Sequence, residues 1–140
     1  MQDNLYETES ILIIEDDESL IHTLETILHQ HEFKIDSVNN GKAALKLLTK
    51  KIYPLILFDI KLPDMDGIKL IGKIEDTAPK IRKIVMTGYP SIENAQSALK
   101  FGVHAYLVKP FQPEQLIKEI KNQLEIRYEE LKELYHSLRF

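Results

Sequence analysis

The sequence contains no cysteine, which excludes disulfide bonds, thiolate metal sites and cysteine nucleophiles. A chain without cysteine suits a reducing compartment, so we expect a cytoplasmic protein. No apolar run approaches the roughly 20 residues that a transmembrane helix needs. The first residues, MQDNLYETES, carry acidic side chains rather than the basic start of an export signal. We therefore expect no membrane partner.

An excess of positive charge is also missing, because the net charge is −4 at pH 7. This argues against direct binding to nucleic acid. The 140 residues, 44% of them hydrophobic and 29% charged, are enough for one globular domain with a core of useful size. We expect a flexible lead at residues 1–9, a folded domain at residues 10–124 and a helical extension at residues 125–140.

A continuous apolar run, Leu55 to Phe58, ends at Asp59. Such a run is typical of a parallel strand that is covered on both faces of the sheet. An Asp66-Gly67 pair follows and indicates a turn. Because open α/β sheets hold their functional groups beyond the carboxyl ends of the strands, Asp59 is the first candidate functional residue.

Strand-like runs and amphipathic helix patterns alternate five times along the chain. The other four strands are expected at Ser10 to Ile14, Phe33 to Val38, Lys83 to Met86 and His104 to Val108. Helices are expected from about Glu18 to Gln30, over Ala44 to Leu48, from Ile68 until Pro79, from Ser91 to Phe101, and from Pro113 onward. This alternation predicts a doubly wound (βα)5 α/β domain, with a parallel sheet and helices on both of its faces.

Polar side chains follow four of the five predicted strands: Glu15 and Asp16, Asp59, Thr87 and Lys109. Since parallel strands end at one edge of the sheet, these side chains should meet there. Carboxylates that lie together repel one another unless a cation joins them, and Mg²⁺ prefers such oxygen ligands. Lys109 and Thr87 supply hydrogen-bond donors for a phosphoryl group, and a carboxylate can itself be phosphorylated.

Four motifs, ILIIEDDE, LILFDIKLPDMDG, IVMTGY and AYLVKPF, resemble in order and spacing the receiver domain of bacterial two-component response regulators. The resemblance covers Ser10 to Leu124 and implies a flavodoxin-like sheet with strand order 2-1-3-4-5. It implies a phosphorylation-activated signalling switch rather than an enzyme that acts on other substrates. The phosphoryl donor would be a sensor histidine kinase or a phosphotransfer protein.

The resemblance also implies a role for each residue of the metal site. Asp59 would be the phosphoacceptor and, with Asp16, a direct ligand of Mg²⁺. Glu15 would bind the metal through water, and the backbone carbonyl of Lys61 would complete the protein ligands. Many members of the family have aspartate where Glu15 stands, a change that keeps the charge.

The remaining roles concern the phosphoryl group and the response to it. Lys109 would pair with the phosphate, and Thr87 and Tyr106 would form the switch pair. Phosphorylation would change the face made by the fourth helix, the fifth strand and the fifth helix. An aromatic residue in an apolar strand is often simply part of the core, so the switch role of Tyr106 depends on the resemblance alone.

Two alternatives remain open. A haloacid-dehalogenase-like phosphatase also uses an aspartate after a buried strand together with Mg²⁺, but it normally has a second aspartate two residues later, where this sequence has Lys61. A pseudo-receiver would keep the fold as a binding module and never take phosphate. The presence of Asp16, Asp59, Thr87 and Lys109 together argues against it.

An apolar stripe continues past the predicted domain at four- and three-residue spacing: Leu124, Tyr128, Leu131, Tyr135 and Leu138. This spacing is typical of a coiled-coil seam. We therefore expect the extension to form a parallel homodimer that links the domain to whatever follows.

Overall fold

The computed structural model describes residues 10–75 and 80–138. The predicted lead, residues 1–9, and the predicted helix breaker Pro79 lie outside the described residues. Strands and helices alternate as predicted: β1 Ser10–Ile14, α1 Glu18–Gln30, β2 Lys34–Val38, α2 Gly41–Leu48, β3 Leu55–Asp59, α3 Gly67–Gly72, β4 Arg82–Thr87, α4 Ile92–Lys100, β5 Ala105–Val108 and α5 Pro113–Leu138.

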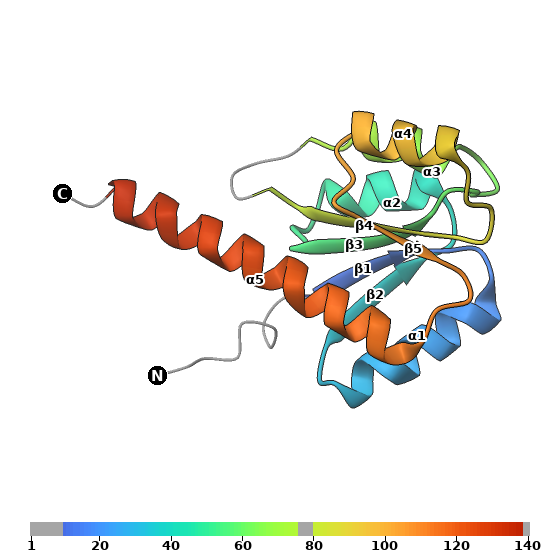
Figure 1. Ribbon diagram of the computed structural model, residues 1–140, viewed down its shortest axis with the longest axis horizontal. Helices are drawn as coiled ribbons and strands as arrows, with labels where there is room; N and C mark the ends of the chain where they lie inside the picture. The colour runs from blue at the N-terminus through green and yellow to red at the C-terminus, as the bar shows by residue number, and fades with distance from the viewer. Residues whose placement is uncertain (1–9, 76–79, 139–140) are drawn as a thin grey trace.

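The described strands form one parallel sheet in the order β2-β1-β3-β4-β5 (Figure 1), which confirms the predicted fold and strand order. The central strand β3 is buried along its whole length. Ile14 of β1 lies beside Phe58 of β3, and Asp59 lies beside Met86 of β4. These three strands therefore end at the same edge of the sheet.

The helices form a layer on each face of the sheet, with α1 and α5 on one side and α2, α3 and α4 on the other (Figure 1). Alternate side chains of each buried strand point to opposite layers, as the strand period of two requires. Ile11, Ile13, Leu55 and Leu57 pack with α1 and α5. Leu12, Ile14, Ile56 and Phe58 pack with α2, α3 and α4. Burial on both faces explains why the strands read as continuous apolar runs.

Most predicted element ends differ from the observed ones by at most one residue. Two helices differ by more: α2 already begins at Gly41, directly after its N-cap Asn40, and α3 ends at Gly72, well before the predicted limit at Pro79. Strand β4 extends one residue beyond the predicted Lys83 to Met86 at each end, because Arg82 still pairs with Leu55 and Thr87 with Val108. Helix α4 has Ser91 as its N-cap, as predicted, and the Ser91 hydroxyl accepts a hydrogen bond from the Asn94 amide at 3.0 Å. The chain leaves this helix through Gly102, whose φ of +83° suits glycine.

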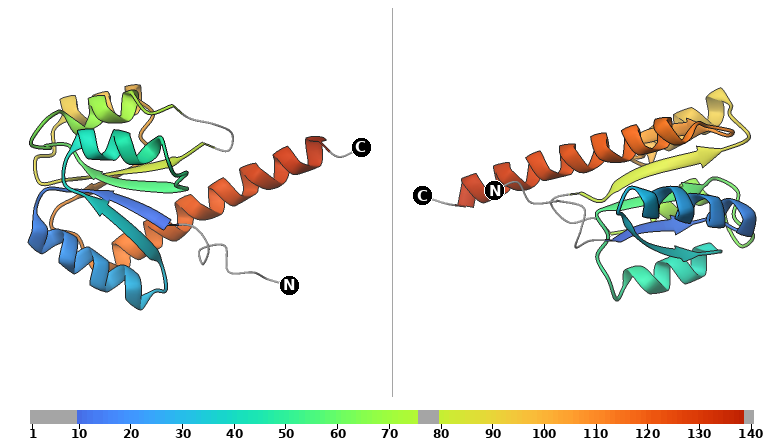
Figure 2. Two further views of the ribbon diagram at one scale, coloured as in Figure 1. Left: turned by 180° about the vertical axis from the view of Figure 1, so that it is seen from behind. Right: turned by 90° about the horizontal axis from the view of Figure 1, so that it is seen from below.

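Helix α5 contributes only its first half to the core. Leu116, Ile117, Ile120 and Leu124 are buried against the sheet and α1. The helix then continues without a break to Leu138 and projects beyond the sheet (Figure 2). Within the described residues, no helix is both long enough and apolar enough to cross a membrane.

A polar contact at the outer edge of the sheet joins β2 to the segment before β3. The Asp36 carboxylate accepts hydrogen bonds from the Lys51 ammonium at 2.7 Å and from the Tyr53 hydroxyl at 2.5 Å. The hydrogen bond from Lys51, followed by that from Tyr53, holds the pKa of Asp36 below its usual value. The Asp36 side chain is 37% exposed, so solvent screens much of this interaction.

We expect the stabilisation from Asp36 to depend on pH. Because its pKa is lower in the folded chain than in the unfolded chain, the stabilisation is complete above the unfolded pKa and is lost as pH falls through the folded pKa. Asp36→Asn should lower the free energy of unfolding at neutral pH by at most about 1 kcal/mol. The difference should shrink as pH falls from about 5 to about 3. Urea unfolding of both proteins across this range, with Glu125→Gln as an exposed control, measures it; a difference that does not vary with pH would contradict the assignment.

Candidate functional site

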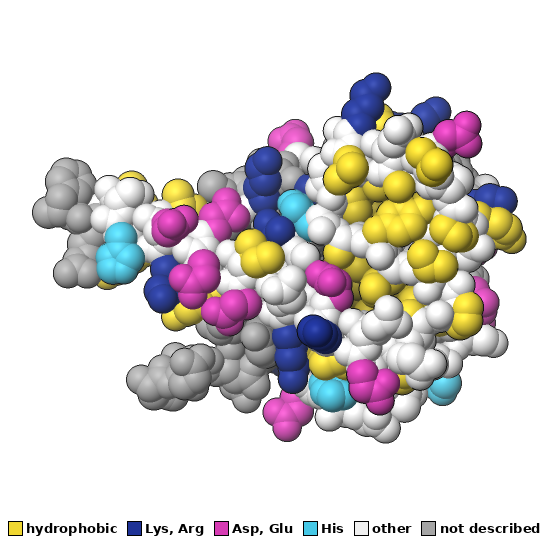
Figure 3. Space-filling model, viewed as in Figure 1, with side chains coloured by type: hydrophobic (Ala, Val, Ile, Leu, Met, Phe, Trp, Pro, Cys, Tyr) yellow, Lys and Arg dark blue, Asp and Glu magenta, His cyan; other side chains and the backbone are white. Residues whose placement is uncertain are grey.

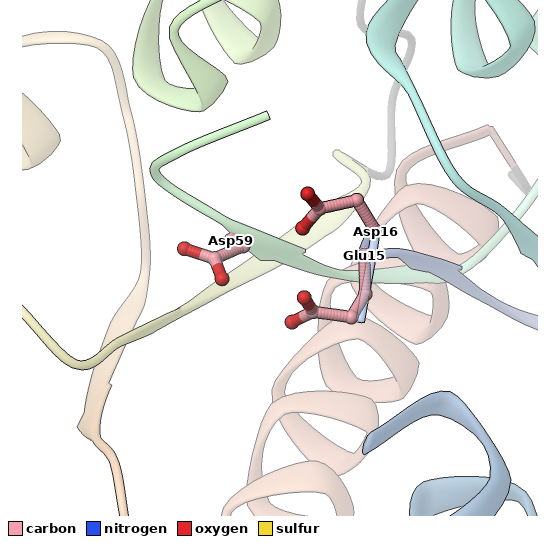
Figure 4. Close-up of side chains that lie close together, drawn as sticks. All are labelled: Glu15, Asp16 and Asp59. Atoms are coloured by element: carbon pink, nitrogen blue, oxygen red, sulfur yellow. The ribbon is translucent and has the colours of Figure 1, made fainter. Parts of the chain in front are cut away.

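The shared edge of the sheet brings the polar residues that follow the strands together. Glu15 and Asp16 follow β1, and Asp59 ends β3, with their carboxylates gathered beyond the strand ends (Figure 4). One oxygen from each of these three side chains lies within 4.8 Å of the others. The sequence predicted this proximity from the parallel sheet alone.

Lys109, which follows β5, joins two of these carboxylates. Its ammonium lies 2.6 Å from Oδ2 of Asp59 and 2.9 Å from Oε1 of Glu15. The Lys109 backbone amide donates to the Thr87 carbonyl at 2.7 Å, which fixes the start of the segment after β5. Burial works to lower the pKa of Lys109, but hydrogen bonds and charge from Asp59 and Glu15 outweigh it, and the net shift is upward. Lys109 is thus held as a cation beside Asp59.

Glu15 is the most enclosed of the three acids, with 1% of the residue exposed. Burial raises the pKa of its carboxyl group, and the hydrogen bond from Lys109 only partly offsets this. A site with three carboxylates and one ammonium is short of positive charge. Its donor set consists of oxygen atoms alone, which fits a hard divalent cation such as Mg²⁺.

The loop after β3 is folded tightly against the end of that strand. The Lys61 amide donates to Oδ1 of Asp59 at 3.1 Å, so the loop backbone helps to orient the carboxylate. The Gly67 amide donates to the Ile60 carbonyl at 2.6 Å. A Cβ atom at Gly67 would lie 2.0 Å from the Asp59 carbonyl oxygen, so only glycine fits there. The role of the Lys61 carbonyl as a metal ligand stays a prediction.

The predicted switch residues lie in β4 and β5. Thr87 is fully buried, and its hydroxyl accepts a hydrogen bond from the Tyr89 amide at 2.9 Å. Tyr106 is half-buried, with its ring against the cluster that lies under α2, α3 and α4. Its hydroxyl is enclosed and has no hydrogen-bond partner. The ring thus belongs partly to the core. The buried hydroxyl without a partner costs free energy and so makes this inward conformation of Tyr106 less stable.

One neighbour of the site was not predicted. The Lys61 ammonium lies 3.9 Å from the centre of the Tyr89 ring, a cation–π contact that joins the loops after β3 and β4. Both residues stand two positions beyond a site residue, Asp59 or Thr87. That spacing was visible in the sequence, but it does not show that the two side chains meet.

Comparison with known proteins settles the family. A family model described as the response regulator receiver domain matches residues 11–121. The chain belongs to the receiver domain family of response regulators. It is 37% identical over 100 residues, 71% of its length, to the transcriptional regulatory protein ZraR of Klebsiella oxytoca, and covers 23% of that protein. The receiver domain thus spans about a quarter of the length of the curated relatives that it matches.

Solved structures agree with this assignment. The CheY-like receiver domain protein of Methanospirillum hungatei JF-1 has 34% identity and a TM-score of 0.83, over 87% of this chain and 98% of that one. The beryllofluoride-activated NtrC4 receiver domain dimer has 31% identity and a TM-score of 0.79, over 84% and 98%. The chain is therefore a receiver domain that acts as a phosphorylation-activated signalling switch, as its motifs predicted. Neither alternative, a phosphatase or a pseudo-receiver, gains support from these relatives.

Proposed function

We propose that this receiver domain accepts a phosphoryl group on Asp59. The observation that carries the proposal is the contact between the Lys109 ammonium and Oδ2 of Asp59 at 2.6 Å. It places a fixed cation beside a carboxylate that could attack phosphorus, where the ammonium can neutralise an incoming phosphoryl oxygen. Mg²⁺ would be held by Asp16, Asp59 and the Lys61 carbonyl, and through water by Glu15.

The reaction needs little from the protein beyond positioning and charge. A carboxylate oxygen of Asp59 forms a bond to phosphorus while the bond from phosphorus to the donor atom breaks, and the electron pair of that bond leaves with the donor. Lys109 balances the charge of the phosphoryl oxygens, and Mg²⁺, when bound, supplies the remaining positive charge. In hydrolysis, water displaces the Asp59 carboxylate from phosphorus and inorganic phosphate leaves. The domain thus catalyses only its own phosphorylation and dephosphorylation.

The donor would be a sensor histidine kinase or a phosphotransfer protein in the cytoplasm. A cavity of about 570 Å³ lies beside Lys109, between α1 and the start of α5, and is lined mainly by apolar side chains such as Leu20, Ile27 and Phe111. An apolar surface next to the acceptor suits a protein donor. The acidic net charge makes nucleic acid an unsuitable direct partner.

The responding surface would be the face formed by α4, β5 and α5. Apolar side chains gather over β5, between α4 and the start of α5 (Figure 3). Ile92, Leu99 and Val108 are among the exposed hydrophobic residues of α4 and β5. A phosphoryl group on Asp59 would draw the Thr87 hydroxyl toward it, and Tyr106 would follow. This is a shift between two populated arrangements driven by a local charge.

Trapping the phosphorylated residue tests the acceptor assignment. The full chain is incubated with acetyl phosphate and Mg²⁺, reduced with borohydride, digested and mapped by mass spectrometry. Borohydride converts an acyl phosphate on aspartate to homoserine, which marks the site. We expect the mark at Asp59 alone; a mark on another aspartate, or none, would overturn the assignment.

We also propose a parallel homodimer through the second half of α5. Leu131, Tyr135 and Leu138 are 44%, 62% and 77% exposed and continue one stripe along the projecting helix. Such a stripe is buried when two helices pair along a heptad seam. The NtrC4 receiver domain, which is similar in fold and sequence, is a dimer in its beryllofluoride-activated form.

A shortened chain that ends at Glu125 tests the dimer. This end keeps Leu124, which is part of the core, and Gln123, which accepts a hydrogen bond from Arg82 at 2.9 Å. Because two heptads pair only weakly, the test needs a protein concentration of about 50 μM. There we expect the full chain to sediment as a dimer and the shortened chain, which lacks the exposed stripe, as a monomer. Monomers in both cases, with and without phosphorylation, would contradict the proposal.

A further inference from the structure

The first turn of α2 is capped largely by a residue from outside the helix. The Gly41 amide donates to Oδ1 of Asp64 at 2.8 Å, and the Lys42 amide donates to Oδ2 of Asp64 at 2.9 Å. The helix's own N-cap, Asn40, accepts from the Ala43 amide at 2.8 Å. The first three amides of the helix, which no helical carbonyl can satisfy, are therefore all hydrogen-bonded, two of them to one carboxylate.

Asp64 belongs to the loop that begins at the acceptor. The base of this loop is fixed to β3 by the hydrogen bond between Gly67 and Ile60 and by a bridge between Lys61 and Asp66. At the same base, the Lys61 amide holds one oxygen of Asp59. Lys61, which bonds to the acceptor Asp59, and Asp64, which caps α2, are therefore only three residues apart in the same loop.

The tip of the loop has a second contact with the same helix end. A Cβ atom at Gly41 would lie 2.5 Å from the sulfur of Met65, so the Met65 side chain occupies the space that a side chain at position 41 would fill. The tip therefore rests on the N-terminus of α2 through one packed side chain and one bidentate carboxylate. Of these two, only the carboxylate fixes direction, because hydrogen bonds are directional and methionine packing is adaptable.

We propose that Asp64 is a positioning residue for the phosphorylation of Asp59, and that it couples the acceptor loop to the N-terminus of α2. The proposal rests on the proposed function of Asp59. By anchoring the loop tip, Asp64 holds the Lys61 peptide in the place where its amide orients the acceptor carboxylate. When Oδ1 of Asp59, the oxygen that accepts from the Lys61 amide, becomes bonded to phosphorus, the Lys61 peptide shifts. The shift then reaches the Gly41 and Lys42 amides through Asp64.

Asn40 provides a matched control, because it caps the same helix end but lies outside the acceptor loop. Asp64→Ala and Asn40→Ala each remove capping from α2, and both should lower the midpoint of thermal unfolding. With acetyl phosphate and Mg²⁺, we expect Asp64→Ala to slow phosphorylation by about tenfold, the size of effect typical for groups that orient a reactive side chain. Asn40→Ala should change it less than about twofold. Asp64→Asn, which keeps one acceptor oxygen, should recover part of the rate.

Hydrogen exchange supplies a second readout that does not depend on turnover. In the wild-type chain, beryllofluoride with Mg²⁺ should change the exchange rates of the Gly41 and Lys42 amides, and Asn40→Ala should keep this response while Asp64→Ala loses it. Equal phosphorylation rates in Asp64→Ala and Asn40→Ala, or no response at these amides in the wild type, would overturn the inference. If instead the wild-type chain is not phosphorylated on Asp59 at all, the proposed function fails first.

Discussion

Asp59→Asn should abolish phosphorylation by acetyl phosphate, because the amide lacks the negatively charged oxygen that attacks phosphorus. The variant should still fold, since asparagine has nearly the same shape and can still accept the Lys61 amide that now bonds to Oδ1. Retention of phosphate on a phosphate-affinity gel, with circular dichroism as the check on folding, measures the result. We expect label to fall below about 1% of the wild-type level, as for loss of a catalytic nucleophile.

Two variants sharpen this experiment. Asp36→Asn makes the same chemical change in β2, away from the site, and should leave labelling intact. Asp16→Asn removes a proposed metal ligand but keeps the nucleophile, so it should raise the Mg²⁺ concentration needed for half-maximal labelling by about tenfold or more. Full labelling of Asp59→Asn would show that another residue accepts the phosphoryl group.

Lys109→Met should have the largest effect on stability without Mg²⁺. The change leaves the carboxylates of Glu15 and Asp59, which are 1% and 11% exposed, without the ammonium between them. Removing one partner of a buried ion pair costs about 3–5 kcal/mol. We expect a loss of about 2 kcal/mol in the free energy of unfolding, because Glu15 can take up a proton and methionine keeps most of the apolar stem in place.

Addition of Mg²⁺ should then stabilise Lys109→Met by more than it stabilises the wild type. In the wild type the ammonium already neutralises part of the site, whereas in the variant a bound cation is the main source of positive charge. Urea unfolding of both proteins with and without Mg²⁺ tests this, and Lys51→Met, which breaks an ion pair at the edge of the sheet, is the control. An equal gain from Mg²⁺ in both proteins would show that Lys109 does not compete for the site.

The sequence predicted the fold and the meeting of the strand-end residues for one physical reason. In a parallel sheet all carboxyl ends face the same way, so Glu15, Asp59 and Lys109 could be brought together without knowledge of side-chain conformations. The capping of α2 by Asp64 could not be predicted in this way. It depends on how the loop tip lies against a helix that begins 23 residues earlier in the chain.

Tyr106 shows a different limit. Its pattern allowed either a core residue or a switch residue, and the structure combines the two, with a packed ring and an enclosed hydroxyl. The position of such a side chain follows from small differences between packing and an unsatisfied hydrogen bond, each of about 1–3 kcal/mol. The spacing of apolar residues in a sequence cannot show which of two free-energy terms of this size is the larger.

The projecting half of helix α5 would act as a lever for small rotations of the core. The first half of the helix is clamped against the sheet beside α1, and the remainder continues as the same helix to Leu138. From Leu124 to Leu138 the helix extends about 21 Å at the helical rise of 1.5 Å per residue. A tilt of only about 5° at the clamped end would therefore move the far end by about 2 Å. A displacement of about 2 Å matches the helix shifts seen at subunit interfaces that change state, so in the proposed dimer a small tilt of the core would alter the packing of the seam far from Asp59.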